Sequence, residues 1–223
     1  MATRSRRPER RQEPLSRERI VNAAVELLDT VGESGLTFRA LAERLATGPG
    51  AIYWHVTGKT ELLAAAIDAV VTTTVADDDT DTTPKQAIRA LALGVFDAID
   101  AHPWVGTYLA RTPGQPRMLR VFEHIGRHVQ ALHVPEAAQF TAASALMSYI
   151  LGVAGQNAAH TRAVQPGTDR AEFLDAVATR WEELDPDQYP FTRSVAGQLR
   201  EHDDRDEFLA GIDLILTGIT ARW

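Results

Sequence analysis

The residues whose types and spacing point most directly to chemistry form one short segment, Pro49-Gly50-Ala51-Ile52-Tyr53-Trp54-His55. Proline is well tolerated at the first position of a helix, and Gly50 allows the backbone to approach a ligand closely. Tyr53 and His55 can donate hydrogen bonds to phosphate oxygens. Lys59 stands at the start of the next predicted helix, where unpaired N–H groups also favour an anion. The segment therefore predicts contact with DNA.

Three predicted helices would position these residues. Apolar residues recur at helical spacing between Ser16, a suitable N-cap, and Gly32, a suitable stop. A short helix follows Thr37 and ends before a break at residues 46–48, and a third covers about residues 49–55. Two short helices joined by such a break on a packed first helix are typical of a helix-turn-helix.

The remainder of the chain also shows helical periodicity, and no run of alternating strand residues interrupts it. A fourth helix is predicted from Lys59 to Val70, followed by an acidic, aperiodic linker at residues 76–84. We therefore expect an all-α protein of about nine or ten helices with three parts. These are a disordered basic arm at 1–15, a helix-turn-helix DNA-binding domain at 16–62, and a helical ligand-binding and dimerisation domain at 63–223. Further helices are predicted at about 84–101, 103–111, 117–132, 135–164, 170–184 and 206–222.

Charge is distributed unevenly along the 223 residues. The formal net charge is −7, yet residues 1–60 hold 10 of the 23 basic and only 7 of the 30 acidic residues. A basic head on an acidic body suggests that only the head meets a polyanion. The chain has no cysteine, which excludes disulfides and thiolate sites. No run of 18 apolar residues and no secretory signal is found, so we expect a cytoplasmic protein without a membrane span.

Residues 16–63 resemble the DNA-binding domain of the TetR (tetracycline repressor) family, from SRERIVNAAVELLDTVG through GLTFRALAERL to AIYWHVTGKTELL. The segments SYILGVAGQ at 148–156 and FLAGIDLILTGI at 208–219 resemble that family's regulatory domain. The resemblance implies a repressor that binds a palindromic operator as a homodimer. It implies that Arg39 contacts a base or phosphate and that Tyr53, His55 and Lys59 contact the backbone. The full set expected at the DNA is Arg39, Gly48, Pro49, Gly50, Tyr53, Trp54, His55 and Lys59.

Two positions depart from the family's pattern. Ala46 stands where the family usually has a turn glycine, and Gly48 stands where a serine or threonine often caps the third helix. Glycine is an acceptable N-cap, but it supplies no side-chain contact to DNA. Base recognition is therefore expected to depend on Arg39, the backbone and Pro49.

The resemblance also implies that a small-molecule inducer occupies the C-terminal domain and releases the DNA. Several residues of its predicted helices combine apolar with polar character, as a pocket for such a ligand requires. The expected ligand contacts, for an inducer that the sequence does not identify, are Trp104, Tyr108, Phe122, Met147, Tyr149, Gln156 and His160. We expect no cofactor.

Two alternatives remain open from the sequence. The C-terminal domain could bind a protein partner in place of a small molecule. The chain could also be a helical enzyme using His124 and His128, which lie four residues apart on one helix face. No third metal ligand and no catalytic motif can be identified, so we predict neither a metal site nor enzymatic activity.

The last predicted helix carries a stripe of apolar residues at Phe208, Ile212, Ile215 and Ile219. Gly211 and Gly218 would let another helix approach closely, and helix 135–164 is also rich in small residues. We expect these two helices of each subunit to form the homodimer interface.

Overall fold

The computed structural model describes residues 14–71, 82–111, 116–163 and 169–222, and in these residues it contains eleven α-helices and no strand. The chain divides into two compact units, Met1–Ala69 and Val70–Trp223. The all-α prediction is confirmed. Residues 1–13 of the predicted basic arm and most of the predicted linker lie outside the described residues. The boundary between the units lies seven residues beyond the predicted one because α4 runs through both Leu62 and Ala69.

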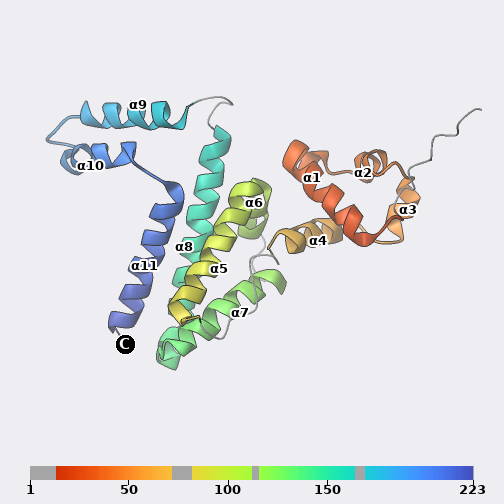
Figure 1. Ribbon diagram of the computed structural model, residues 1–223, viewed down its shortest axis with the longest axis horizontal. Coiled ribbons are helices and arrows are strands. Elements are labelled where there is room, and N and C mark those ends of the chain that lie inside the picture. Colours follow the sequence, from red (N-terminus) through yellow and green to blue (C-terminus); the bar gives the residue numbers. More distant parts are fainter. Residues whose placement is uncertain (1–13, 72–81, 112–115, 164–168, 223) are drawn as a thin grey trace, which may run out of the picture. The chain divides into compact units, whose positions relative to one another are not determined.

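The described part of the first unit contains α1 to α4, shown in red to orange in Figure 1. The Ser16 side chain caps α1 by accepting a hydrogen bond from the Arg19 backbone N–H at 3.2 Å, as predicted. The predicted stop, Gly32, adopts a positive φ of 68° and breaks the helical backbone there. A further short helical stretch follows the break, so α1 ends at Gly35. The bounds are α1 (Arg17–Gly35), α2 (Phe38–Arg44), α3 (Pro49–Tyr53) and α4 (Lys59–Val71).

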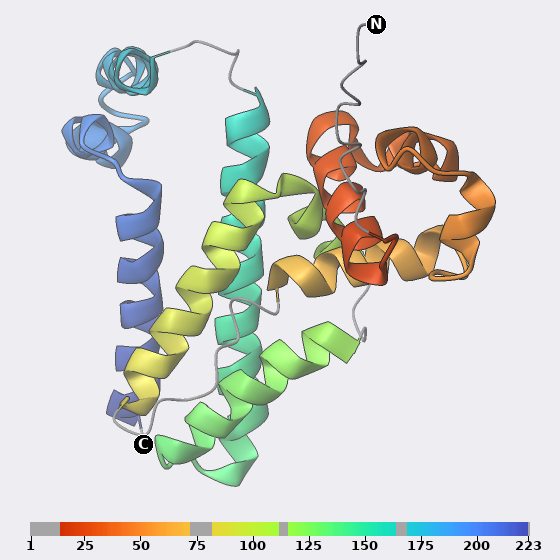
Figure 2. The ribbon, with the colours of Figure 1, turned by 45° about the vertical axis from the view of Figure 1, so that its right-hand side comes forward.

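The second unit is arranged around its longest helix, α8. Helices α5, α6, α7 and α11 all pack against α8 (Figures 1 and 2). Helices α9 and α10 form an antiparallel pair that packs mainly on itself. The bounds are α5 (Pro84–Ala101), α6 (Pro103–Arg111), α7 (Pro116–Ala131), α8 (Glu136–Ala163), α9 (Arg170–Glu182), α10 (Pro190–Arg200) and α11 (Asp204–Arg222).

One segment of α8, Glu136–His160, is long and apolar enough to cross a membrane by length and composition alone; the search covered only the described residues. In the structure this helix packs against other helices of the same chain. Its buried residues, among them Leu146 and Ile150, face the four helices that pack on it. The share of this apolar stretch that is buried is 28%, so we interpret α8 as the helix on which the other helices of the second unit pack, with one face left uncovered.

The first turn of α5 shows how local sequence sets these helices. Thr83 and Gln86 form a reciprocal capping box, and Pro84 occupies the first helical position. The predicted bounds of α5 and α6 agree with the structure. Helix α10 was not predicted from the sequence. Its apolar stripe has only three large residues, Phe191, Val195 and Leu199, and polar residues and Gly197 stand between them.

The predicted role of the apolar stripe on α11 needs correction. Phe208 and Ile212 are completely buried within a single chain, because α11 packs on α5 and α8. These two residues therefore cannot form a subunit interface. Gly211 does allow a close approach, but by Tyr149 of α8 in the same chain, whose hydroxyl occupies the space that a Cβ would fill. The outward face of α11 instead presents Leu214, which is 75% exposed.

Candidate nucleic-acid interface

The turn between α2 and α3 sets the geometry of the helix-turn-helix. Thr37 caps α2 by accepting a hydrogen bond from the Ala40 N–H at 3.1 Å, as predicted. After α2 the chain reverses through Ala46, whose φ of 52° lies in the left-handed region. Gly48 then caps α3 without a side-chain hydrogen bond, and Pro49 begins the helix. The predicted break and the predicted start of α3 are therefore confirmed.

Ala46 provides a stability test of this turn. The left-handed conformation costs a residue with a Cβ about 1–2 kcal/mol, whereas glycine adopts it freely but loses more entropy on folding. Ala46→Gly should therefore stabilise the protein by about 0.5–1 kcal/mol, measured as a higher melting temperature by calorimetry. The matched control, Ala40→Gly inside α2, should destabilise by a similar amount. If both variants were destabilised equally, the strain assigned to Ala46 would be absent.

Helix α3 buries one residue and exposes most of the others. Ile52 is completely buried and holds the helix on its base. Gly50 is exposed, and no atom lies within 4 Å of the position that its Cβ would occupy. The helix is shorter than predicted and ends at Tyr53, with Trp54 as its C-cap. An indole that is 90% exposed directly after this helix is available to a partner.

Tyr53 is oriented by an aromatic contact that the sequence did not reveal. Its ring stacks on Phe38 of α2, with centroids 4.4 Å apart and an interplanar angle of 8°. The ring is still partly exposed, so the hydroxyl can reach a ligand while the stack limits its rotation. Phe38 thus connects the start of α2 with the end of α3.

Arg39 lies on the exposed surface of α2. Its Nε donates to Glu43 Oε1 at 3.0 Å in an i,i+4 pair. An exposed pair of this kind is worth only a few tenths of a kcal/mol, so a nucleic acid can compete for the guanidinium. The pair with Glu43 therefore orients the Arg39 side chain along α2, but it is weak enough to be broken by another ligand.

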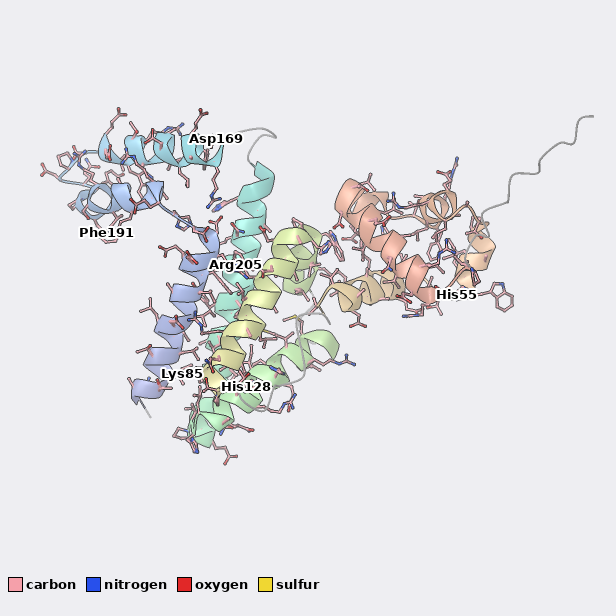
Figure 3. All side chains as sticks on the ribbon, in the orientation of Figure 1. His55, Lys85, His128, Asp169, Phe191 and Arg205 are labelled. Atoms are coloured by element: carbon pink, nitrogen blue, oxygen red, sulfur yellow. The ribbon has the colours of Figure 1, made fainter. Side chains whose placement is uncertain are left out.

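Lys59 is tied to the first helix. Its Nζ donates to the backbone carbonyl of Glu33 at 2.6 Å, and an ammonium group has two further N–H bonds to offer. The charge is thus placed at the first residue of α4, whose N-terminal N–H groups also attract anions. His55 lies nearby, half-buried, in the turn between α3 and α4 (Figure 3).

Glu61 organises the same turn and was not predicted as a site residue. Its carboxylate accepts from the Thr57 backbone N–H and the Thr57 hydroxyl, both at 2.7 Å, and from Arg17 at 2.9 Å. The Thr57 N–H and then Arg17 lower the pKa of Glu61 to about 2. The carboxylate therefore stays ionised and ties the turn to α1. An acidic residue three positions into a helix, after Thr57-Gly58, is the signal that could have identified this role.

The described part of this unit is less basic than the charge count over residues 1–60 suggested. Its arginines are largely paired with acids, as Arg17–Glu61, Arg39–Glu43 and Arg44–Glu26. The five arginines of the N-terminal arm lie outside the described residues. Electrostatic attraction to a polyanion is therefore expected to depend strongly on that arm.

The residues expected to contact a ligand have different environments in the second unit. Trp104 of α6 and Met147 of α8 are buried, and Tyr108 and Phe122 are half-buried. Phe122 packs edge-on against Phe140 of α8, with centroids 6.0 Å apart. Gln156 and His160 are exposed near the end of α8.

Tyr149 packs against α11 of its own chain. Its ring stacks on Phe208 at a centroid distance of 5.7 Å, and its hydroxyl donates to the Phe208 carbonyl at 3.3 Å. Burial, and then the charge of Glu207, raise the pKa of the Tyr149 hydroxyl. This residue joins α8 to α11.

A short exposed helix on a helix-turn-helix base, followed by a separate helical unit, defines a DNA-binding transcriptional regulator. Two family models agree: bacterial regulatory proteins of the tetR family match residues 20–66, and the tetracyclin repressor-like C-terminal domain matches residues 77–223. The chain belongs to the TetR family of bacterial regulators. This confirms the resemblance found in the sequence, and the chain is a regulator and not an enzyme.

Known relatives and solved structures agree with this assignment. An HTH-type transcriptional regulator of Saccharopolyspora erythraea is 31% identical over 66% of this chain and 64% of that protein. The HTH-type transcriptional repressor DrrR1 of Streptomyces coeruleorubidus is 28% identical over 96% of this chain and 81% of the repressor. The structure of SCO7222, a TetR from Streptomyces coelicolor, is 66% identical, with a TM-score of 0.83 over 93% of this chain and 99% of that one.

The fold is also shared with a more distant regulator. ActR of Streptomyces coelicolor, solved in complex with actinorhodin, has a TM-score of 0.72 at 23% identity and covers 94% of this chain and 98% of its own. At this identity the likeness extends to the fold alone.

Proposed function

We propose that this chain is a cytoplasmic repressor that binds a palindromic operator as a homodimer and releases it when a small molecule occupies the second unit. The observation that carries the proposal is α3, which rests on buried Ile52 and leaves Pro49, Gly50 and Trp54 exposed. A helix presented in this way can enter the major groove, whose base edges identify each base pair.

Each residue at this surface has a proposed role. Arg39 exchanges Glu43 for a guanine edge or a phosphate, since both offer paired acceptors to its guanidinium. Tyr53, His55 and Lys59 contact phosphates. Trp54 packs on the DNA backbone, while Gly48, Pro49 and Gly50 allow the helix N-terminus to approach the bases.

The proposed inducer site lies in the second unit. The match to the tetracyclin repressor-like domain over residues 77–223 supports it, and so does the structure of ActR, which has a similar fold and was solved in complex with actinorhodin. Trp104, Met147 and Phe122 supply apolar surface, and Tyr108 supplies a hydroxyl. The exposed Gln156 and His160, and Tyr149 with its bond to α11, would contact the ligand only at the edge of the site. The inducer itself is unidentified.

The proposed homodimer follows from the size of α3. One helix of five residues reads few base pairs, so a palindromic operator with half-sites about 34–36 Å apart requires two copies. Helices α8 and α11 pack on each other, and each keeps an uncovered face that includes Gly152 on α8 and Leu214 on α11. We assign the dimer contact to these faces.

The DNA-binding proposal can be tested with two substitutions. The operator is first selected from random duplex DNA by the purified protein. Lys59→Ala should weaken binding to every sequence and reduce the slope of log affinity against log salt by about one unit. Arg39→Ala should cost about 1–3 kcal/mol on the operator and less on random DNA. Both affinities are measured by fluorescence anisotropy over a range of salt concentrations.

The control is Lys85→Ala, which removes an exposed lysine from α5 in the second unit. It should leave both the affinity and the salt slope unchanged. An unchanged salt slope for Lys59→Ala would remove Lys59 from the interface. Equal losses on operator and random DNA for Arg39→Ala would exclude a role in base recognition.

A further inference from the structure

Two aromatic rings meet on the candidate DNA surface, where the start of α2 lies beside the end of α3. Phe38 is the first residue of α2, and Tyr53 is the last residue of α3. Their rings are nearly parallel, with an interplanar angle of 8° and centroids 4.4 Å apart. Parallel rings in van der Waals contact are about 3.5 Å apart, so the two rings are displaced sideways by roughly 2.7 Å. This is the offset stack that aromatic side chains prefer.

The chain holds the two rings with different firmness. Phe38 is half-buried, and the helix that carries it is fixed at its start by the Thr37 cap. Tyr53 is 55% exposed and belongs to a helix of five residues, in which only Ile52 is buried. An exposed tyrosine on so short a helix can adopt several χ1 rotamers unless a neighbour selects one. The Phe38 ring is the neighbour that makes this selection.

We propose that Phe38 is a positioning residue for operator binding, because its ring holds the Tyr53 hydroxyl where a phosphate oxygen of the DNA can accept a hydrogen bond. The inference rests on the proposed function, in which Tyr53 contacts a phosphate. Phe38 carries no polar group, so it cannot donate a hydrogen bond to a phosphate itself. It acts through Tyr53, whose hydroxyl is the donor.

The stack contributes by ordering Tyr53 before the DNA binds. A side chain that is mobile in the free protein loses rotamer freedom on binding, and this loss weakens the affinity. For one such side chain the effect corresponds to about 2–10-fold in affinity. With Phe38 in place the ordering takes place during folding, so the hydroxyl binds as part of a preformed surface.

A double-mutant cycle tests whether Phe38 acts through Tyr53. The selected operator is titrated by fluorescence anisotropy with the parent protein, Phe38→Ala, Tyr53→Phe and the double variant. Tyr53→Phe keeps the stack but removes the hydroxyl, and it should weaken binding by about 10-fold, as the loss of a hydrogen bond to a charged group does. Phe38→Ala should weaken binding by about 2–10-fold in the parent protein and by less than about two-fold in the Tyr53→Phe background. The same loss in both backgrounds would overturn the proposal, as would an unchanged affinity for Tyr53→Phe.

Two further variants separate positioning from a loss of fold. Phe38→Tyr keeps an aromatic ring for the stack, so it should bind the operator within about two-fold of the parent protein. Phe173→Ala removes an aromatic residue that is 44% exposed on α9, and it should leave the affinity unchanged. Weak binding by Phe38→Tyr would contradict the role of the ring. A parent protein that bound no duplex DNA would overturn the proposed function and this inference with it, whereas equal losses in both backgrounds on a bound operator would overturn this inference alone.

A measurement on the free protein detects the positioning without DNA and covers the case in which Phe38→Ala unfolds the chain. With ¹³C-labelled tyrosine, nuclear relaxation gives an order parameter for each of the four tyrosine rings, and Tyr53 is identified by the signal missing from Tyr53→Phe. Although Tyr53 is more than half exposed, its ring axis should show an order parameter near the ~0.85 of a rigid backbone. A value below about 0.6 in the parent protein would mean that the stack does not hold the hydroxyl in place.

Discussion

Replacing Phe208 with alanine should lower the free energy of unfolding by about 3–5 kcal/mol. The side chain is completely buried where α5, α8 and α11 meet. It stacks on Phe96 at a centroid distance of 4.7 Å and on Tyr149 at 5.7 Å. Truncation removes both ring contacts and leaves a cavity that helices held by other contacts cannot fully close. Urea unfolding followed by far-ultraviolet circular dichroism measures the loss.

The control for this substitution is Phe191→Ala on α10. It removes the same number of atoms from a ring that is 75% exposed, so its effect should stay within about 0.5 kcal/mol. The protein concentration is kept the same for both variants, because association also stabilises the folded chain. A loss below about 1 kcal/mol for Phe208→Ala would mean that the three helices do not depend on this contact.

The start of a helix could be predicted from sequence where a local rule determines it. Ser16, Thr37, Pro49 and Pro84 each marked the start of a helix correctly, because capping and the fixed φ of proline depend on near neighbours. Helix α10 escaped notice even though Pro190 begins it. The apolar stripe of α10 is short because this helix packs mainly on one other helix, α9, and the rest of its surface is polar.

Which partner buries an apolar stripe could not be predicted. The periodicity of α11 correctly identified Phe208 and Ile212 as buried, but a period says nothing about whether the covering helix belongs to the same chain. Gly211 likewise indicated a close approach without showing whether the neighbouring helix belongs to the same chain or to a partner. The structure resolves both, since Tyr149 and the helices of its own chain fill these positions.

The sequence predicted which single residues belong to the candidate DNA surface, but not the contacts that orient them. Spacing and resemblance indicated Arg39, Tyr53 and Lys59. The contacts that orient them involve residues distant in sequence, such as Phe38 under Tyr53 and the Glu33 carbonyl at Lys59. The first pair depends on how α3 lies beside α2 and the second on how α4 lies beside α1, and no local pattern specifies either arrangement.

Replacing Leu214 with arginine should convert the protein to a monomer and lower operator affinity by about 10³-fold, toward that of non-specific binding. Leu214 is an apolar side chain, 75% exposed on α11, and in the proposed dimer it is covered by a second copy. An unpaired arginine at that contact would lose its water without gaining a partner. In the monomer the side chain returns to solvent, so the fold should be retained. Each α3 would keep all its contacts, but two half-sites would no longer be bound together.

The test combines sedimentation with operator binding on the same samples. Leu119→Arg is the matched control, since it adds the same charge at an exposed leucine of α7, away from the proposed contact. It should remain dimeric and bind the operator as the parent protein does. Circular dichroism should give the same helix content for both variants. If Leu214→Arg stayed dimeric and kept full operator affinity, the dimer contact would have to lie away from the outward face of α11.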